Sequence, residues 1–177
     1  MHTKDTRRMV LCAICIAVCF VVTRFLAVPV FYTKGYVNLG DVTVLLIAYI
    51  IGGSYGALSA GIGSCMADAS LSFYYYVPAT FVIKALMVLI ADFFFEHAEK
   101  KSSKKLMFLW IVSGVIIAEV FMVAGYFLYE LILYKKGAFA SVAGNLIQAV
   151  TCAVPSVILI MIFQSNAVVR KILKNQK

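Results

Sequence analysis

Ionisable and amide side chains interrupt the apolar stretches of this sequence. They are Asn38, Asp41, Asp68, Lys84, Asp92, Glu119, Glu130, Asn145 and Gln148. Such groups can hold a small polar molecule by hydrogen bonds, and paired carboxylates can also do acid–base chemistry. No Ser–His pair or metal-ligand cluster accompanies them in the sequence. We therefore expect a binding site without catalytic residues, metal or cofactor.

The spacing of these residues places several of them on shared helix faces. At about 100° per residue, Glu119, Tyr126 and Glu130 fall on one side of a single helix. Asn145 and Gln148 lie close together on the next helix. Two such stripes facing each other would form a pocket with a carboxylate, two amides and a tyrosine. This lining suits a small polar aromatic solute, whose ring stacks on aromatic side chains.

The composition indicates which elements position these groups. Of 177 residues, 63% are hydrophobic and 14% are charged, with a mean hydropathy of +0.97. A soluble domain has roughly 45–50% apolar and about 25% charged residues. The length accommodates about six spans of about 20 residues with short connections. We therefore predict an all-α membrane protein with one transmembrane domain, residues 1–177, in the cell membrane.

The apolar runs give the bounds of six predicted spans. They cover residues 9–28, 37–51, 55–72, 78–95, 106–134 and 139–163. Residues 29–36 and 96–105 are predicted loops, and Tyr74–Tyr76 resembles an interfacial aromatic belt.

Basic residues predict the orientation of these spans. Eleven of the sixteen form three clusters: Lys4, Arg7 and Arg8; Lys100, Lys101, Lys104 and Lys105; Arg170, Lys171, Lys174 and Lys177. Each cluster flanks an apolar run, as cytoplasmic loops do under the positive-inside rule. Both termini are therefore predicted to be cytoplasmic, with only Lys34, Lys135 and Lys136 on the other side. This pattern explains the net charge of +8 without a nucleic-acid partner.

Some of the intramembrane polar groups also have structural interpretations. An ionisable residue at the bilayer centre costs roughly 2.5–3.5 kcal/mol, so each needs a partner or a role. Asp68 and Lys84 can form a structural ion pair, and Asp92 can be solvated or paired with the basic loop. Asn145 and Gln148 can bridge helices by hydrogen bonds. Glu130 has no comparable structural role, which favours a functional one.

Several motifs resemble a known family. They are residues 36–41 (YVNLGD), 52–64 (GGSYGALSAGIGS), 67–68 (AD), 76–84 (YVPATFVIK), 125–130 (GYFLYE) and 144–148 (GNLIQ). Together they resemble the substrate-binding S components of energy-coupling factor (ECF) transporters. The last two resemble S components for pyridoxine-type vitamins and for the thiamin precursor hydroxymethylpyrimidine.

The resemblance implies a vitamin site near the extracellular face and docking onto a membrane T component and two ATPases. Ala13 and Ala17 form a small-xxx-small pair that permits close helix approach, and they match the family's docking contact. The predicted substrate-binding residues are Asn38, Asp41, Lys84, Tyr126, Glu130, Asn145 and Gln148. No G-x-x-x-x-G-K-[ST] phosphate loop is present, so a partner must supply the energy.

Two other functions remain open from the sequence. One is an intramembrane enzyme that uses Asp41 and Asp68 as an acid–base pair. The other is a non-catalytic membrane protein that assists assembly of a complex. Binding of a vitamin to the purified chain without ATP would distinguish an S component from both.

Overall fold

Helices make up most of this chain. The computed structural model describes residues 3–29, 36–166 and 168. In chain order the elements are α1 (Thr3–Phe25), β1 (Ala27–Pro29), β2 (Tyr36–Asn38), α2 (Gly40–Ile50), α3 (Gly53–Ser70), α4 (Val77–Glu99), α5 (Lys104–Tyr134), η1 (Lys135–Ala138) and α6 (Phe139–Ser165). The Arg170–Lys177 cluster and Lys34 lie outside the described residues.

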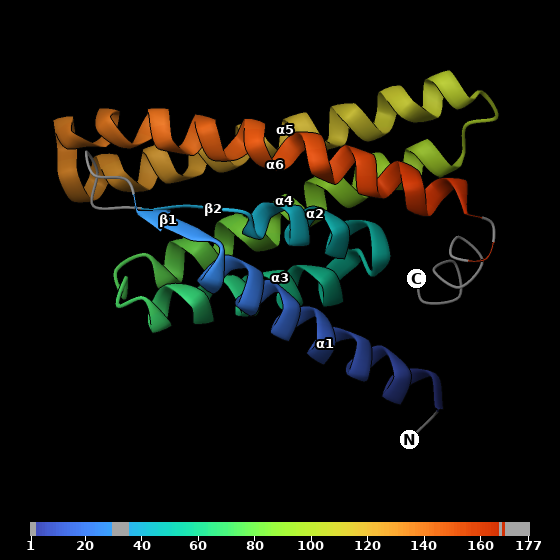
Figure 1. Cartoon of the computed structure of the whole chain (residues 1–177), viewed down its shortest axis with the longest axis horizontal. Coiled ribbons are helices and arrows are strands. Elements are labelled where there is room, and N and C mark those ends of the chain that lie inside the picture. The colour runs from blue at the N-terminus through green and yellow to red at the C-terminus, as the bar shows by residue number, and fades with distance from the viewer. Residues whose placement is uncertain (1–2, 30–35, 167, 169–177) are drawn as a thin grey trace.

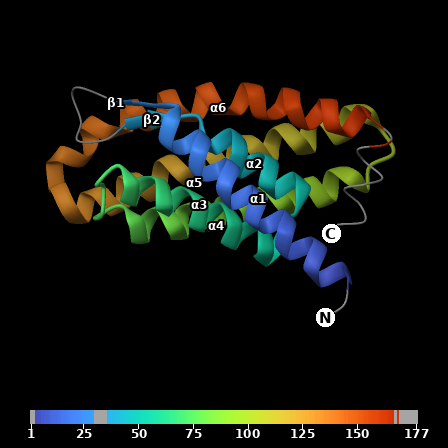
Figure 2. The same cartoon turned by 60° about the horizontal axis from the view of Figure 1, so that its bottom comes forward.

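The helices run along the long axis of the molecule, which therefore has two distinct ends (Figure 1). One end, here called the hairpin end, holds β1 and β2, residues 71–76 and η1. The other, the basic end, holds the first turns of α1, residues 100–103 and the last turn of α6. Helix α1 packs on α3, α3 on α4, α4 on α5, and α5 on α6 (Figure 2).

Helix α2 occupies the centre of the bundle, where it contacts α1, α3, α4 and α6. Eight of its eleven residues are buried, including Val44, Leu45 and Ala48. A helix that is apolar on every side is stable only when other elements surround it. This central position brings Asp41, in its first turn, to the middle of the polar groups on α4 and α6.

Glycines allow the tight turn between α2 and α3. Gly52 and Gly53 have φ of 60° and 52°, which side chains other than glycine rarely adopt. A Cβ at Gly52 would lie 2.2 Å from Asp92 Oδ1. Asp92 Oδ2 accepts a hydrogen bond of 2.7 Å from the Gly53 N–H. Asp92 is thus buried against the start of α3, so of its two predicted states, solvated or paired with the basic loop, the solvated one is wrong.

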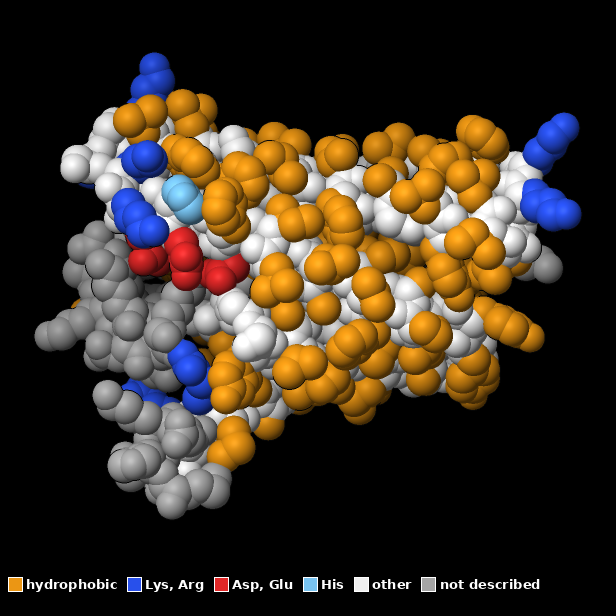
Figure 3. All heavy atoms as spheres, turned by 180° about the vertical axis from the view of Figure 1, so that it is seen from behind, with side chains coloured by type: hydrophobic (Ala, Val, Ile, Leu, Met, Phe, Trp, Pro, Cys, Tyr) orange, Lys and Arg blue, Asp and Glu red, His pale blue; other side chains and the backbone are white. Residues whose placement is uncertain are grey.

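The surface agrees with a protein that lies in a membrane. Three helical stretches of the described residues are long and apolar enough to cross one: Thr6–Phe25, Val77–Glu99 and Lys104–Ser165. The third contains both α5 and α6, which η1 joins at the hairpin end. Figure 3 shows apolar side chains over the middle of the bundle and basic side chains at its two ends.

Some predicted bounds were wrong. The first helix ends at Phe25 rather than at residue 28, because the residue before a proline disfavours the helical conformation and Pro29 follows. Residues 27–29 and 36–38 instead pair as antiparallel strands, a small departure from an all-α fold. The loop predicted for 96–105 shrinks to residues 100–103. Charged residues there suggested a loop, but Glu, Lys and Ala are good helix formers.

Candidate binding site

A cavity opens at the hairpin end, between the start of α2, the α3–α4 turn, α5 and α6. It has about 420 Å³ of empty space, including the part open to the outside. Its lining residues are Asn38, Asp68, Phe73, Tyr76, Thr80, Tyr126, Glu130, Asn145 and Gln148. Five of the seven predicted substrate-binding residues therefore meet there: Asn38, Tyr126, Glu130, Asn145 and Gln148. The structure brings them together from β2, α5 and α6.

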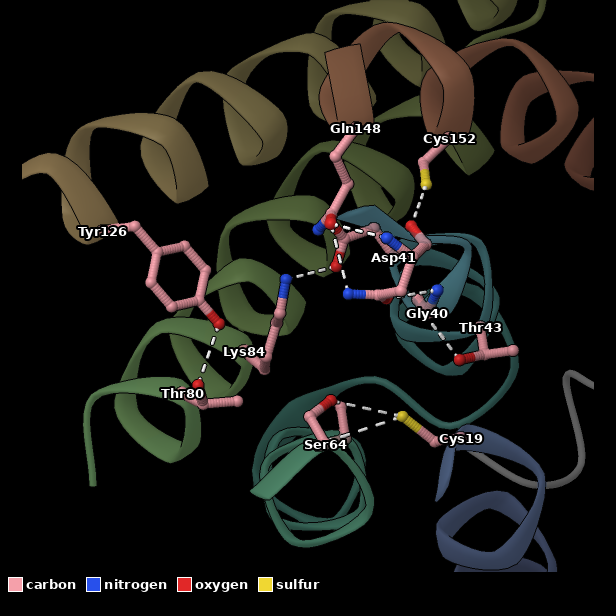
Figure 4. Close-up of polar contacts among 12 residues, drawn as sticks. Cys19, Gly40, Asp41, Thr43, Ser64, Thr80, Lys84, Tyr126, Gln148 and Cys152 are labelled. Atoms are coloured by element: carbon pink, nitrogen blue, oxygen red, sulfur yellow. Dashed lines mark hydrogen bonds and ion pairs between the residues drawn. The ribbon is translucent and has the colours of Figure 1, made fainter. Parts of the chain in front are cut away.

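Gln148 connects the cavity to a polar network below it. Its Oε1 accepts hydrogen bonds from the backbone N–H and from Nδ2 of Asn38, at 2.9 and 3.1 Å. Its Nε2 donates to Asp41 Oδ2 at 2.6 Å (Figure 4). Asn38 Oδ1 in turn accepts a 2.7 Å bond from the Gly40 N–H at the start of α2. One glutamine on α6 thus fixes both the end of β2 and the first turn of α2.

Lys84 forms an ion pair with Asp41, and both side chains are buried. The Lys84 ammonium also lies 5.3 Å from the centre of the Tyr126 ring. The predicted alternative of an Asp68–Lys84 pair is therefore replaced by Asp41–Lys84. Neither Asp41 nor Lys84 lines the cavity, so direct contact of these two residues with a ligand stays a prediction.

Aromatic side chains form one wall of the cavity. The Tyr76 ring lies 6.2 Å from Phe73 and 6.4 Å from Tyr126, centre to centre. The Tyr126 hydroxyl hydrogen-bonds with Thr80 Oγ1 at 3.0 Å. Such rings can stack on a flat heteroaromatic molecule while their hydroxyl groups stay paired.

Glu130 is held in place by two hydroxyl groups. The Tyr76 hydroxyl donates to Oε1 at 3.0 Å, and the Ser141 hydroxyl donates to Oε2. Burial, and then the negative charge of Glu130, raises the pKa of Tyr76 above its ordinary value. Tyr76 therefore remains a protonated donor. These bonds orient the Glu130 carboxylate at the cavity, where its remaining lone pairs can accept further bonds.

Asn145 has an unused donor in the same cavity. Its Nδ2 is buried and has no hydrogen-bond partner among the described residues. A buried donor without a partner costs roughly 1–3 kcal/mol, so an acceptor placed there gains correspondingly. A ligand with a ring nitrogen or hydroxyl oxygen at this point would satisfy the amide. The Nδ2 group of Asn145 therefore does not bridge two helices, whereas Gln148 does, by its bond to Asp41 on α2.

Glu119 does not line this cavity, although it lies near enough to the Asp41–Lys84 pair to interact electrostatically with both residues. It is buried, and neither of its oxygens has a hydrogen-bond partner within the described part of the chain. The helical stripe predicted on α5 is therefore divided, since Tyr126 and Glu130 line the cavity and Glu119 does not.

Sequence reasoning missed three lining residues: Phe73, Tyr76 and Thr80. Tyr76 was assigned to an interfacial belt with Tyr74 and Tyr75. Those two are 65% and 78% exposed, whereas Tyr76 turns inward to Glu130. Only the hydrogen bond to Glu130, 54 positions away in the sequence, distinguishes Tyr76 from the other two tyrosines. Asp68 also lines the cavity; from the sequence it was one of the polar groups able to hold a ligand, but it was not among the seven predicted substrate-binding residues.

The fold and the cavity define a multi-pass membrane protein with a small polar site at one end of a helical bundle. Residues 3–165 match the family model described as ECF-type riboflavin transporter, S component. The chain belongs to this family. It is therefore a substrate-binding subunit for vitamin uptake that works with an ECF module of T and ATPase subunits, and not an enzyme that uses Asp41 and Asp68.

A relative is also known by sequence. The chain is 29% identical over 132 residues to a protein of Pyrococcus woesei described as an uncharacterized protein in a gap 3' region. The match covers 74% of this chain and 84% of the relative. Its description names no substrate.

Proposed function

We propose that this chain captures a small heteroaromatic vitamin or precursor from outside the cell. Pyridoxine, pyridoxal, pyridoxamine and hydroxymethylpyrimidine all have one flat ring with hydroxymethyl and amino or hydroxyl groups. The observation that supports this class is the free Asn145 amide beside the oriented Glu130 carboxylate. An acceptor on the ring would meet Asn145, a hydroxyl or amino group would donate to Glu130, and Tyr76 and Tyr126 would contact the ring face.

Riboflavin is the second candidate, because the family model that matches is described by that vitamin. Its three fused rings and sugar-like chain need more room than a single substituted ring. Titration calorimetry of the purified chain, without ATP, with pyridoxine, hydroxymethylpyrimidine and riboflavin separates the candidates. Tightest binding of a single-ring compound supports the proposal, and tightest binding of riboflavin contradicts it. Binding of no vitamin would contradict both.

Changes at Glu130 and Asn145 should weaken vitamin binding. Removing either group leaves a ligand atom unpaired in a desolvated site, at a cost of roughly 1–3 kcal/mol, or about 5- to 150-fold. We expect Glu130→Gln and Asn145→Ala each to lower the affinity at least tenfold in calorimetry. Asp92→Asn at the basic end is the control. It keeps an oxygen for the Gly53 N–H and should change affinity less than about threefold. Unchanged affinity in both cavity variants would place the site elsewhere.

The number of membrane spans and their orientation are also part of the proposal. Helices α1, α4, α5 and α6 each cross the membrane, while α2 is only about 16 Å long and α3 about 27 Å. Strand β2 precedes α2 and adds about 10 Å to its length. Together β2 and α2 therefore extend far enough into the membrane to connect with α3. Six spans result, with the basic end cytoplasmic under the positive-inside rule.

Labelling from outside tests this orientation. In a cysteine-free background, a cysteine at Lys136 in η1 should react with an impermeant maleimide. A cysteine at Ser102, between α4 and α5, should react only after the cells are opened. Both positions are exposed, so access to the protein surface is matched. External reaction at Ser102 would contradict the six-span arrangement.

The position of Ala13 and Ala17 fits the proposed docking contact. Both are exposed on α1, whereas Cys15 and Cys19 on the same helix are buried against the bundle. The exposed face has large apolar side chains as well, such as Ile14 and Val18. We propose that a helix of the T component packs against the two alanines, and that two ATPases join through it.

A further inference from the structure

A second hollow lies on the outer face of α5 and α6, away from the vitamin cavity. It has about 1050 Å³ of empty space, open to the surface, and an almost wholly apolar lining. Its lining includes Val120, Ala124, Phe127, Phe139, Leu146 and Val150, and the buried side chain of Glu119 also borders it. The groove shares no lining residue with the vitamin cavity. We refer to it as the α5–α6 groove.

The groove has the depth of one bilayer leaflet. Phe139 begins α6 at the hairpin end, and Ala153 lies about 21 Å further along the helix. One leaflet of a bilayer, including its headgroup region, is about 20–22 Å thick. The groove therefore runs from the proposed outer surface to about the middle of the membrane.

Two lysines stand at the outer end of the groove, within η1 and just before Phe139. Lys135 and Lys136 are exposed, and within the described residues neither forms an ion pair with an acidic side chain. Both depart from the trend that places basic residues at the cytoplasmic ends. Lys135 also has a φ of 51°, where glycine would be less strained. Two exposed cations just before the first groove residue, Phe139, give this end of the groove a charge complementary to an anionic headgroup.

We propose that the α5–α6 groove binds an anionic phospholipid. One acyl chain lies in the groove, and the phosphate headgroup contacts Lys135 and Lys136. The apolar lining matches the chain, and the lysines match the charge of the headgroup. This proposal rests on the proposed placement of α5 and α6 in the membrane, and it is independent of which vitamin binds.

Quenching of tryptophan fluorescence by lipids with brominated chains tests the groove. Trp110 is the sole tryptophan, so Trp110→Phe gives a silent background. Val150→Trp then reports on the groove, and Val82→Trp on α4 reports on ordinary lipid contact. These valines are 67% and 53% exposed, so both substitutions are tolerable. The chain is placed in phosphatidylcholine vesicles that contain brominated phosphatidylglycerol or brominated phosphatidylcholine.

We expect Val150→Trp to show at least about a fivefold preference for phosphatidylglycerol, since one lysine near the surface accounts for about that much and both lysines contact the headgroup. Val82→Trp should show none. Adding Lys135→Gly and Lys136→Gln should remove the preference, while Lys135→Gly alone should keep or raise the melting temperature because glycine accepts the backbone conformation. Thus loss of lipid preference would not reflect loss of folding.

Three outcomes would overturn the proposal. Equal quenching by both lipids at Val150→Trp would mean ordinary annular lipid only. A preference that survives both lysine changes would exclude the headgroup contact. Weaker quenching at Val150→Trp than at Val82→Trp by both lipids would mean that a second copy of the chain fills the groove. Vitamin calorimetry on the same variants reports separately on the proposed function.

Discussion

Replacing Ala13 and Ala17 together with tryptophan should abolish vitamin uptake and leave vitamin affinity unchanged. Both alanines are exposed on α1, and neither lines the cavity at the hairpin end. Close packing of two membrane helices requires small side chains at the contact, and an indole ring would hold the T component's helix away. We expect the rate of uptake into reconstituted vesicles to fall below about a tenth of the wild-type rate. A tenfold change corresponds to a free-energy difference of about 1.4 kcal/mol.

The control is Val82→Trp, which adds the same ring to an exposed membrane-facing position on α4. It should transport normally. Calorimetry should give both variants a vitamin affinity within about twofold of wild type, because neither site touches the cavity. Co-purification with the ECF module should fail for the alanine variant alone. Normal uptake by that variant would exclude Ala13 and Ala17 as the docking contact.

Most of the cavity lining could be predicted from the sequence, because helical periodicity depends only on residues close together in the chain. Tyr126 and Glu130 are four residues apart on α5, and Asn145 and Gln148 are three apart on α6, so the faces they occupy follow from the helix geometry. A four-residue helix joins the two elements, which forces their outer halves to lie together. The structure accordingly places all four residues in one cavity.

The ion-pair partner of Lys84 could not be predicted in the same way. Helical phase shows which face Lys84 occupies on α4, but not which neighbouring helix meets that face. Asp41 and Asp68 were both available, and the choice depends on the short α2 lying at the bundle centre. The bend that turns Tyr76 inward also depends on tertiary contacts, here with Glu130. The strand pair was missed because each strand has only three residues, too few to show a period.

Removing the cation of the Lys84–Asp41 pair should destabilise the chain severely. Asp41 has no exposed surface, so Lys84→Met leaves a buried carboxylate without its counter-ion. Breaking a buried pair in this way costs about 3–5 kcal/mol. Thermal unfolding of the purified chain in detergent should show a large fall in melting temperature. The methionine fills the volume of the lysine stem, so loss of packing would not account for the fall.

The double variant Lys84→Met, Asp41→Asn shows whether the ion pair only holds other cavity residues in place or contacts the vitamin itself. Without either charge, most of the stability should return, because replacing both partners of a buried pair is often neutral. The amide oxygen introduced by Asp41→Asn would still accept the Gln148 Nε2 bond that Asp41 accepts now. If the pair acts by holding Gln148 and Asn38 at the cavity, vitamin affinity should recover to within about threefold of wild type. A stable double variant that binds at least about tenfold more weakly would mean that Lys84 or Asp41 contacts the vitamin itself.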